Sequence, residues 1–193
     1  MTEHSKKKRK RVPKKITPGY LENSCLYYLS RFTTSEENLR RVMMRKVFRS
    51  ANHHGTNPDE GKVLIEDIIS RYLRSGILDD KAYAKAKATA LHRRGNSSRN
   101  IQAKLKQKGL NSDVIDIALA ALREVDKDPE RTAAIRFARR RRLGPFQFCQ
   151  LNDELRKKHL AAMARAGFSY DIAKLIIFAA KEDDLKPYVN EES

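Results

Sequence analysis

The sequence predicts an all-α protein of three tandem three-helix (helix-turn-helix-like) repeats, forming an elongated curved body behind a disordered basic N-terminal arm. Three observations predict this class. Apolar residues recur at helical spacing after residue 18, and no segment alternates as a strand would. Proline and glycine fall between the periodic segments. The same plan of three short helices returns after about 50 residues, and one unit of that size buries too little apolar surface to be stable alone.

The first repeat is expected over residues 18–77, after the arm at 1–17. In TSEENLRRVMMRKVF, Thr34 is the expected N-cap, and Glu37 three residues later completes a capping box. The apolar stripe of this helix comprises Leu39, Val42, Met43 and Val47. The loop ANHHGTNPDEG is expected to end the helix. The following helix ends near Gly76, and its apolar register holds Leu64, Ile68 and Leu73.

The second repeat is expected over residues 78–126, and it opens at the adjacent acids Asp79 and Asp80. A carboxylate at this place accepts free backbone N–H groups and meets the positive end of the helix dipole. Adjacent side chains on a helix do not face each other, so the pair is poorly placed to share one metal ion. We therefore interpret the two aspartates as the start of a helix.

Three helices are predicted in this second repeat. The first is expected to end near Gly95, with an apolar side that comprises Ala82, Tyr83, Ala86 and Ala90. The second stops at Gly109, and its apolar residues are Ile101 and Leu105. The third is capped by Asn111 or Ser112, and its stripe comprises Val114, Ala118 and Leu122.

The third repeat is expected over residues 127–181. It opens at Asp128 with DPERTAAIRFARRRRLG, continues through DELRKKHLAAMARAG and closes with FSYDIAKLIIFAA. The junctions of the second and third repeats are similar, as KQKGLNSDVIDIAL and ARAGFSYDIAKLII show. An acidic C-terminal tail is expected over residues 182–193.

The net charge of +17 is unevenly distributed. Residues 1–15 hold eight Lys/Arg and one Glu, residues 81–108 hold nine Lys/Arg and no acid, and residues 182–193 hold five acids and one Lys. A long segment without acids indicates a polyanion, or a partner with an acidic face. The alternative is a solvated surface. The arm suits non-specific phosphate contact or a nuclear localisation signal equally well.

The candidate partner-binding and DNA-binding residues are basic and lie between the first helix of the second repeat and the middle of the third. They are Lys81, Lys85, Arg93, Arg94, Arg99, Lys104, Lys108, Arg139, Arg140, Arg141, Arg142, Arg156 and Lys157. The run of four arginines has a second explanation, because cations favour the C-terminal end of a helix. That explains one or two of them, so the run favours a binding role.

No constellation of catalytic or metal-binding residues is evident. His53 and His54 lie in the expected loop and are interpreted as an exposed pair, and His92 and His159 as lone surface or boundary residues. Cys25 and Cys149 have no CxxC spacing and are interpreted as reduced thiols. No phosphate-binding glycine loop, GxSxG or HExxH motif occurs. We expect a non-enzyme without metal or cofactor.

No membrane-spanning segment is predicted, because the longest apolar runs, IALAAL and LIIFAA, have six residues each and a span needs about 18. No apolar signal segment follows Met1. The sequence therefore indicates a cytoplasmic protein, expected to be a monomer.

Four motifs in order, YYLSRFTTSEENLRRVMMRK, GILDDKAYA, GNSSRNIQAKLKQKGL and ARAGFSYDIAKLI, resemble the RecX family of bacterial regulators of the RecA recombinase. The resemblance covers about residues 25–180. It implies three tandem three-helix repeats and a non-catalytic protein that binds along the groove of the RecA–DNA filament and inhibits or disassembles it, with a role in DNA repair and the SOS response. The basic arm, Phe32, the long first-repeat loop and the acidic tail depart from the family pattern.

Two functions remain open. The first, which the resemblance and the basic middle segment suggest, is modulation of the RecA filament, with basic side chains meeting acidic protein surface and DNA phosphates. The second is a DNA-binding protein that acts without RecA, because three-helix units and basic helices also suit DNA grooves.

Overall fold

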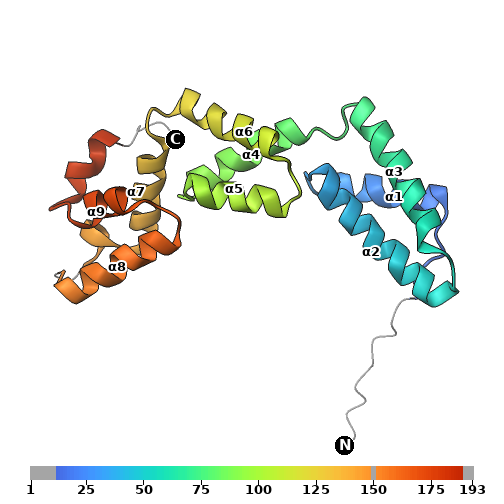
Figure 1. Ribbon diagram of the computed structural model, residues 1–193, viewed down its shortest axis with the longest axis horizontal. Coiled ribbons are helices and arrows are strands. Elements are labelled where there is room, and N and C mark those ends of the chain that lie inside the picture. Colours follow the sequence, from blue (N-terminus) through green and yellow to red (C-terminus); the bar gives the residue numbers. More distant parts are fainter. Residues whose placement is uncertain (1–11, 149–150, 189–193) are drawn as a thin grey trace, which may run out of the picture. The chain divides into compact units, whose positions relative to one another are not determined.

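A computed structural model describes residues 12–148 and 151–188 of the chain. Within these ranges every regular element is helical, so the all-α prediction is confirmed (Figure 1). The chain divides into two compact units, one up to Asp79 and one from Asp80 onward. Most of the basic arm, the end of the acidic tail and Cys149 lie outside the described residues.

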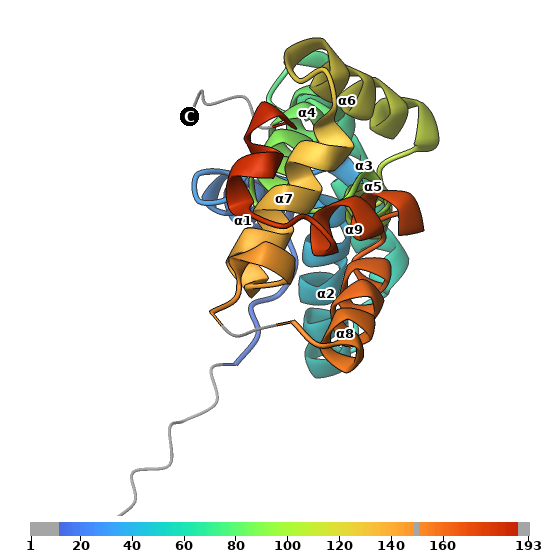
Figure 2. The same cartoon turned by 90° about the vertical axis from the view of Figure 1, so that its left-hand side faces the viewer.

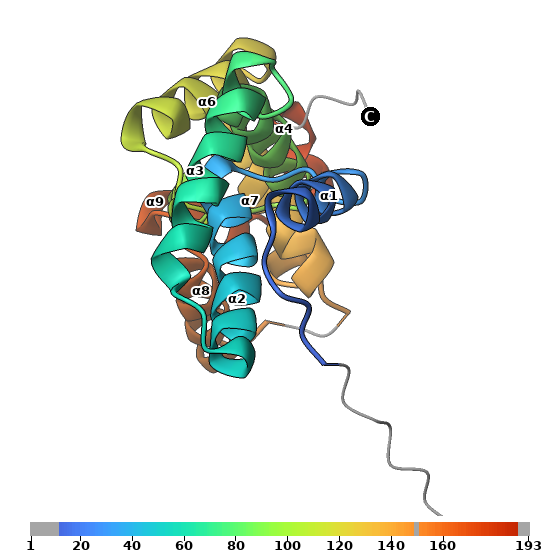
Figure 3. The same cartoon turned by 90° about the vertical axis from the view of Figure 1, so that its right-hand side faces the viewer.

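The first unit consists of α1 (Pro18–Leu29), α2 (Glu36–His54) and α3 (Pro58–Arg74) (Figure 3). Thr17 caps α1, and Pro18 occupies its first turn, where a missing N–H costs nothing. The three helices enclose one apolar core, which comprises Leu21, Cys25, Leu39, Met43, Val47, Ile65, Ile68, Ile69, Tyr72 and Leu78.

The start of α2 differs from the prediction. Its N-cap is Ser35, whose hydroxyl accepts a hydrogen bond from the backbone N–H of Asn38 at 3.3 Å. Thr34 accepts instead from the side-chain amide of Asn38 at 2.7 Å. The Glu37 carboxylate bonds to the guanidinium of Arg40 at 2.6 Å. The expected Thr34–Glu37 capping box is therefore wrong by one residue, because two adjacent hydroxyl residues precede the helix and sequence spacing does not choose between them.

The loop between α2 and α3 is also shorter than predicted. Helix α2 continues to His54 and ends at Gly55, which has the left-handed φ of 67°. Asn57 then caps α3, with Pro58 in its first turn. Gly61, predicted as loop, lies inside α3, where a Cβ would stand 2.6 Å from a methyl carbon of Val47. Helices α2 and α3 thus approach closely at Gly61, a residue type that in a sequence usually indicates the end of a helix.

The buried face of α3 agrees with the prediction in part. Ile68 is buried as predicted and Leu64 is half-buried against the core, whereas Leu73 is 40% exposed. Ile65, Ile69 and Tyr72 complete the buried face. Arg40 of α2 also reaches the Glu66 carboxylate of α3 at 2.7 Å, so an ion pair joins the two helices beside the apolar contact.

Residues 12–17, assigned to the disordered arm from the sequence, are placed on the first unit. The carbonyl oxygen of Pro13 lies 2.8 Å from Nε2 of His54, and Ile16 packs against the core. The part of the arm that the structure describes is therefore anchored at three successive points: Pro13, Ile16 and the Thr17 cap.

The second unit begins with α4 (Asp80–Arg93), α5 (Ser98–Gln107) and α6 (Ser112–Val125). It continues with α7 (Pro129–Arg141), the 3-10 helix η1 (Gly144–Phe146), α8 (Asp153–Arg165), α9 (Tyr170–Ile177) and a second 3-10 helix, η2 (Glu182–Tyr188) (Figure 2). One apolar core lies within α4–α6, and another is built from α7 to η2.

The first helix of this unit buries a different face from the predicted one, although Tyr83 of the predicted set is half-buried and packs against the core. Ala84, Ala88 and Leu91 are buried, whereas Ala82, Ala86 and Ala90 are exposed. Alanine occurs on every side of α4, so it does not mark one face. The other predicted features agree with the structure: Asn111 caps α6, and Ile101, Leu105, Ala118 and Leu122 are buried.

The first part of the acidic tail packs on the second unit. Leu185 of η2 is 2% exposed and belongs to the core built from α7 to η2. The Glu182 carboxylate lies 2.6 Å from the guanidinium of Arg139. Residues 182–188 are therefore part of the folded unit.

Helices α4 and α7 meet at Gly95, and this contact yields a stability prediction. Gly95 has a φ of 72°, and a Cβ there would stand 2.6 Å from the backbone nitrogen of Phe137. We expect Gly95→Ala to lower the free energy of unfolding by about 2–5 kcal/mol, since left-handed strain adds to a clash with rigid backbone. Gly55→Ala is the matched control, with similar φ and open space around it, and we expect a decrease of about 1–2 kcal/mol. Urea unfolding followed by circular dichroism measures both; equal decreases would contradict the close contact.

Candidate nucleic-acid interface

The candidate site is built on the turn that joins α4 to α5. Ser97 caps α5 by accepting from the N–H of Asn100, and its hydroxyl donates to the carbonyl of Ala166 at 2.6 Å. The backbone N–H and hydroxyl of Ser98 donate to the same carboxylate oxygen of Glu130, at 3.0 and 2.6 Å. The turn is therefore held to α7 and to the end of α8 by polar contacts that leave little freedom.

This turn brings arginines of α4 and α7 together. The guanidinium of Arg140 donates to the carbonyl oxygen of Arg94 at 2.5 Å, so the last turn of α7 lies beside the last turn of α4. Arg93, Arg94 and Arg99 are exposed, and none of them forms an ion pair with the residues that the structure describes. Cations from two helical groups thus share one surface without carboxylates to neutralise them.

Aromatic rings support the run of four arginines. The guanidinium carbons of Arg140 and Arg141 lie 5.9 and 6.0 Å from the ring centroid of Phe137. Phe137 in turn packs against Phe168 at 5.6 Å between centroids. A ring face attracts a cation but leaves its full charge, so these two arginines are oriented and still able to bind an anion.

The other two arginines of the run have different roles. Arg139 forms the ion pair with Glu182 and lies 5.5 Å from the Phe146 ring, so it is engaged within the unit. Arg142 ends α7 with a left-handed φ of 55° and lies 5.1 Å from the ring of Phe148. Arg142 is thus the C-cap of α7, and all four arginines lie at the helix end where cations are favoured.

A cavity of about 340 Å³ opens between α5 and the end of α8. Arg99 and Arg165 both line it, together with Asn100 and Gly167. The Asn100 side-chain oxygen is buried and has no hydrogen-bond partner among the described atoms. Arg165 was missed in the sequence because a single arginine in the last turn of a helix only suggests dipole compensation.

The remaining sequence candidates are spread over the unit. Lys81 and Lys85 lie near the start of α4, and Lys81 is about 18 Å along the helix from Arg93. The Nζ atom of Lys104 donates to the side-chain oxygen of Asn96 at 2.6 Å, which places it beside the α4–α5 turn. The other candidate residues do not lie around this turn. Lys108 is the C-cap of α5, Arg156 pairs with Asp153 at 3.1 Å, and Lys157 is exposed on α8.

Two histidines and one cysteine outside this surface are buried in the fold. His92 and His159 are each 7% exposed, so their interpretation as surface or boundary residues is wrong. His92 Nε2 lies 2.8 Å from the carbonyl oxygen of Pro129, which makes it a donor across the α4–α7 contact. Burial raises the pKa of the Cys25 thiol to about 11, so Cys25 remains protonated and unreactive near neutral pH.

The acidic pair and the histidine pair both lie at helix ends. Asp80 is the first residue of α4 and directly follows Asp79, as predicted for a helix start. His53 and His54 lie in the last turn of α2 rather than in a loop, and their ring centroids are 4.7 Å apart. Within residues 12–148 and 151–188, no three His, Cys, Asp or Glu side chains gather as metal ligands would. None of the helices in these ranges is long and apolar enough to cross a bilayer.

The sequence of the chain is similar to one family of known proteins. Residues 79–119, which correspond to α4, α5 and part of α6, match the model of the RecX second three-helix domain. The chain is 43% identical over 176 residues to the Regulatory protein RecX of Myxococcus xanthus, covering 89% of this chain and 92% of that protein. It is 32% identical over 165 residues to the protein of the same name in Agrobacterium fabrum, covering 86% and 85% of the two chains.

Solved structures show the same fold. A crystal structure of a regulatory protein RecX has a TM-score of 0.60 at 21% identity, over 82% of this chain and 70% of that one. A crystal structure of RecX from Lactobacillus salivarius has a TM-score of 0.59 at 19% identity, over 88% and 97% of the two chains.

The buried His159 yields a prediction of pH dependence. Its Nδ1 accepts a hydrogen bond from the Gly144 N–H at 3.1 Å, and burial lowers its pKa below the usual 6.5. The unfolded chain therefore binds a proton more readily, and the stability that neutral His159 contributes is present above about pH 6.5 and is lost as pH falls. We expect His159→Gln to have a lower free energy of unfolding than the unmodified chain at pH 7.5. Between pH 7 and 5 its free energy of unfolding should fall less steeply with pH, by up to about 1.4 kcal/mol per pH unit.

Thermal unfolding of His159→Gln, of the exposed-residue control His53→Gln and of the unmodified chain across this range measures the effect. Identical pH slopes for the unmodified chain and His159→Gln would contradict the prediction.

Proposed function

Because the chain belongs to the RecX family, we propose that it regulates the RecA recombinase by binding RecA and its single-stranded DNA filament, mostly inhibiting recombinase, ATPase and co-protease activity. The observation that supports this most directly is the exposed arginine surface at the α4–α7 contact, where Arg93, Arg94, Arg140 and Arg141 have no carboxylate partner among the described residues. Such a surface suits DNA phosphates and acidic side chains of a protein filament. The proposed role belongs to DNA repair and the SOS response.

Arginine side chains favour directional hydrogen bonds to the carboxylates or phosphates of a bound partner over non-directional attraction of dissolved anions. A guanidinium is planar and presents parallel N–H groups that match carboxylate and phosphate oxygens. Phe137 holds Arg140 and Arg141 in place, so less side-chain entropy is lost when they bind. The α4–α5 turn holds Arg93 and Arg94 at a fixed distance from α7, so the pattern of charges is preorganised.

The proposed mechanism is a shift of populations and requires no covalent step. A bound protein changes the state of a filament only through its different affinity for the active and inactive forms. A preference of about 100-fold, or 2.7 kcal/mol, for the inactive or dissociating form is enough to convert an even mixture almost completely. The protein therefore acts as a binding protein, and its effect is read out in RecA.

A RecA-independent DNA-binding protein is the alternative function. The cluster of basic residues at 6–11 and the basic α5 favour it, because both suit contact with bare duplex phosphates. This alternative predicts tight binding to duplex DNA with a steep salt dependence. High affinity for RecA filaments with weak affinity for bare duplex would exclude it.

Charge-removing variants test the proposed surface. We expect Arg93→Gln/Arg94→Gln to raise the concentration needed to inhibit the DNA-dependent ATPase of RecA by about tenfold, since two cations that would bind the filament are removed. Arg131→Gln/Lys158→Gln is the matched control. It removes the same charge from the second unit, but these cations pair with Asp128 at 3.1 Å and with Glu154 at 2.7 Å.

The control should inhibit like the unmodified chain, and circular dichroism verifies folding. An unmodified chain without effect on RecA ATPase and strand exchange at any ratio would overturn the proposed function, and equal shifts for both double variants would remove the role of Arg93 and Arg94.

Deletion of residues 1–11 separates the arm from the filament surface. The deletion stops before Pro13 because residues 13–17 anchor the first unit. We expect the shortened chain to bind duplex DNA more weakly and to inhibit RecA as before. The slope of log binding constant against log salt concentration should be shallower by up to about 0.9 for each phosphate that the chain no longer neutralises. Fluorescence anisotropy across 50–200 mM salt measures the first effect. Loss of inhibition with an intact fold would show that the arm is part of the filament surface.

A further inference from the structure

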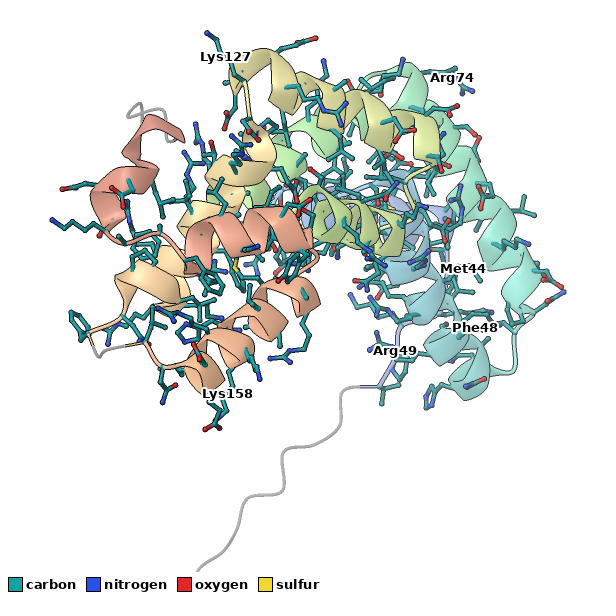
Figure 4. All side chains as sticks on the ribbon, turned by 60° about the vertical axis from the view of Figure 1, so that its left-hand side comes forward. Met44, Phe48, Arg49, Arg74, Lys127 and Lys158 are labelled. Carbon is teal, nitrogen blue, oxygen red and sulfur yellow. The ribbon has the colours of Figure 1, made fainter. Side chains whose placement is uncertain are left out.

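The first unit contains a second cationic site that the sequence did not indicate. A pocket of about 340 Å³ is lined by Val12, Pro13, Lys14, Tyr20, Lys46 and Arg49. Its residues come from three separate parts of the chain: the segment before α1, the first turn of α1 and the middle of α2. Figure 4 labels Arg49 on α2, beside the ribbon of the N-terminal segment. The volume is at the lower end of the range of small-ligand sites, about 300–1,000 Å³.

The pocket combines a ring with cations. The Nζ atoms of Lys14 and Lys46 lie 5.9 and 5.8 Å from the ring centroid of Tyr20. Arg49 completes the lining, and its Nε donates to the backbone carbonyl of Arg45 at 3.1 Å, which orients the guanidinium. Tyr20 itself is half-buried and is fixed at its backbone by the Thr17 hydroxyl, which accepts from its N–H at 3.2 Å.

The charges of the pocket are not neutralised by neighbouring acids. Lys14, Lys46 and Arg49 form no ion pair with the described residues. By contrast, Arg40 and Arg71 of the same unit each contact carboxylates within 2.7 Å. Three cations gathered without a counter-ion repel one another, and an anion in the pocket relieves this repulsion.

The wall of the pocket is anchored before any ligand arrives. Nε2 of His54 lies 2.8 Å from the Pro13 carbonyl oxygen, and Ile16 packs against the core of the unit. Lys14 therefore lies on a short segment held at both ends, and the pocket requires no folding step to form. Six consecutive basic residues, 6–11, directly precede this segment in the sequence.

We propose that this pocket binds one phosphorylated nucleotide unit, with the phosphate among Lys14, Lys46 and Arg49 and the base stacked on Tyr20. Cations beside an aromatic ring are the combination that proteins use for unpaired nucleotides, because every base has a face that stacks. A purely anionic ligand would need the cations but not the ring. The proposal concerns the first unit alone and does not depend on RecA, so it stands or falls separately from the proposed function.

A comparison of normal and abasic strands of equal length distinguishes stacking from charge. With the full-length chain at about 0.2 M salt, we expect Tyr20→Leu to bind a fluorescent oligo(dT) about five- to 100-fold more weakly. Affinity for an abasic strand of the same length should be unchanged. Tyr20→Phe should bind both like the unmodified chain, because it keeps the stacking face. Lys46→Gln should weaken both strands, because both carry phosphates.

Tyr27→Leu is the matched control, because Tyr27 lies on the same helix, is 61% exposed and has Arg31 at 4.7 Å from its ring, but does not line the pocket. It should bind both strands normally. Equal weakening by Tyr20→Leu and Tyr27→Leu, equal weakening of normal and abasic strands in Tyr20→Leu, or unchanged binding of oligo(dT) by a folded Tyr20→Leu would each overturn the proposal.

Photocrosslinking identifies the source of the nucleotide. An oligo(dT) that carries 5-iododeoxyuridine should crosslink to Tyr20, as mapped by mass spectrometry, and a crosslink elsewhere with none at Tyr20 would overturn the proposal. Competition by millimolar dTMP or ATP would support the pocket as a site for a free nucleotide. Persistence of the Tyr20 crosslink in their presence would support the strand as the ligand.

Discussion

The organisation of the second unit depends on the close approach of backbone to backbone at Gly95. The missing side chain lets the α4–α5 turn lie directly on α7, where a Cβ would overlap the backbone nitrogen of Phe137. Hydrogen bonds from Ser97, Ser98 and Arg140 then cross the contact. In the bonds of Ser97 and Arg140 a main-chain carbonyl is the acceptor, and Ser98 donates through both its N–H and its hydroxyl to Glu130, so the contact is polar as well as close.

This constraint determines the electrostatics of the surface. The arginines at the end of α4 and the end of α7 come from different helices, and the close contact at Gly95, with the hydrogen bonds of His92, Ser98 and Arg140, sets their spacing. The cations are then divided by their neighbours. Arg139 is paired with the folded part of the acidic tail through Glu182, whereas Arg140 and Arg141 rest on an aromatic ring and keep their charge. Position beside an acid or a ring, rather than the number of arginines, decides which of them can meet a partner.

The cations of the first unit are also divided into those paired with acids and those beside an aromatic ring. Arg40 and Arg71 are used to join its helices to one another, through Glu66 and Glu22. Lys14, Lys46 and Arg49 line one pocket with Tyr20. The sequence alone did not single out this group, because Lys14 and Tyr20 lie more than 25 positions before Lys46 and Arg49. A ring and three cations become a site only when the segment before α1 is folded back on α2.

The sequence by itself determined the helical class, most helix ends and the sign of the surface, because these depend on local spacing, caps and charge. Asn111, Asp80 and Gly76 could be assigned in this way. Tertiary structure decided the faces and the sites. Alanine on all sides of α4 and two hydroxyl residues before α2 are compatible with several local arrangements, and packing selects one of them. His92 and His159 looked like surface residues because their partners, the carbonyl of Pro129 and the N–H of Gly144, are distant in sequence and are supplied by the fold.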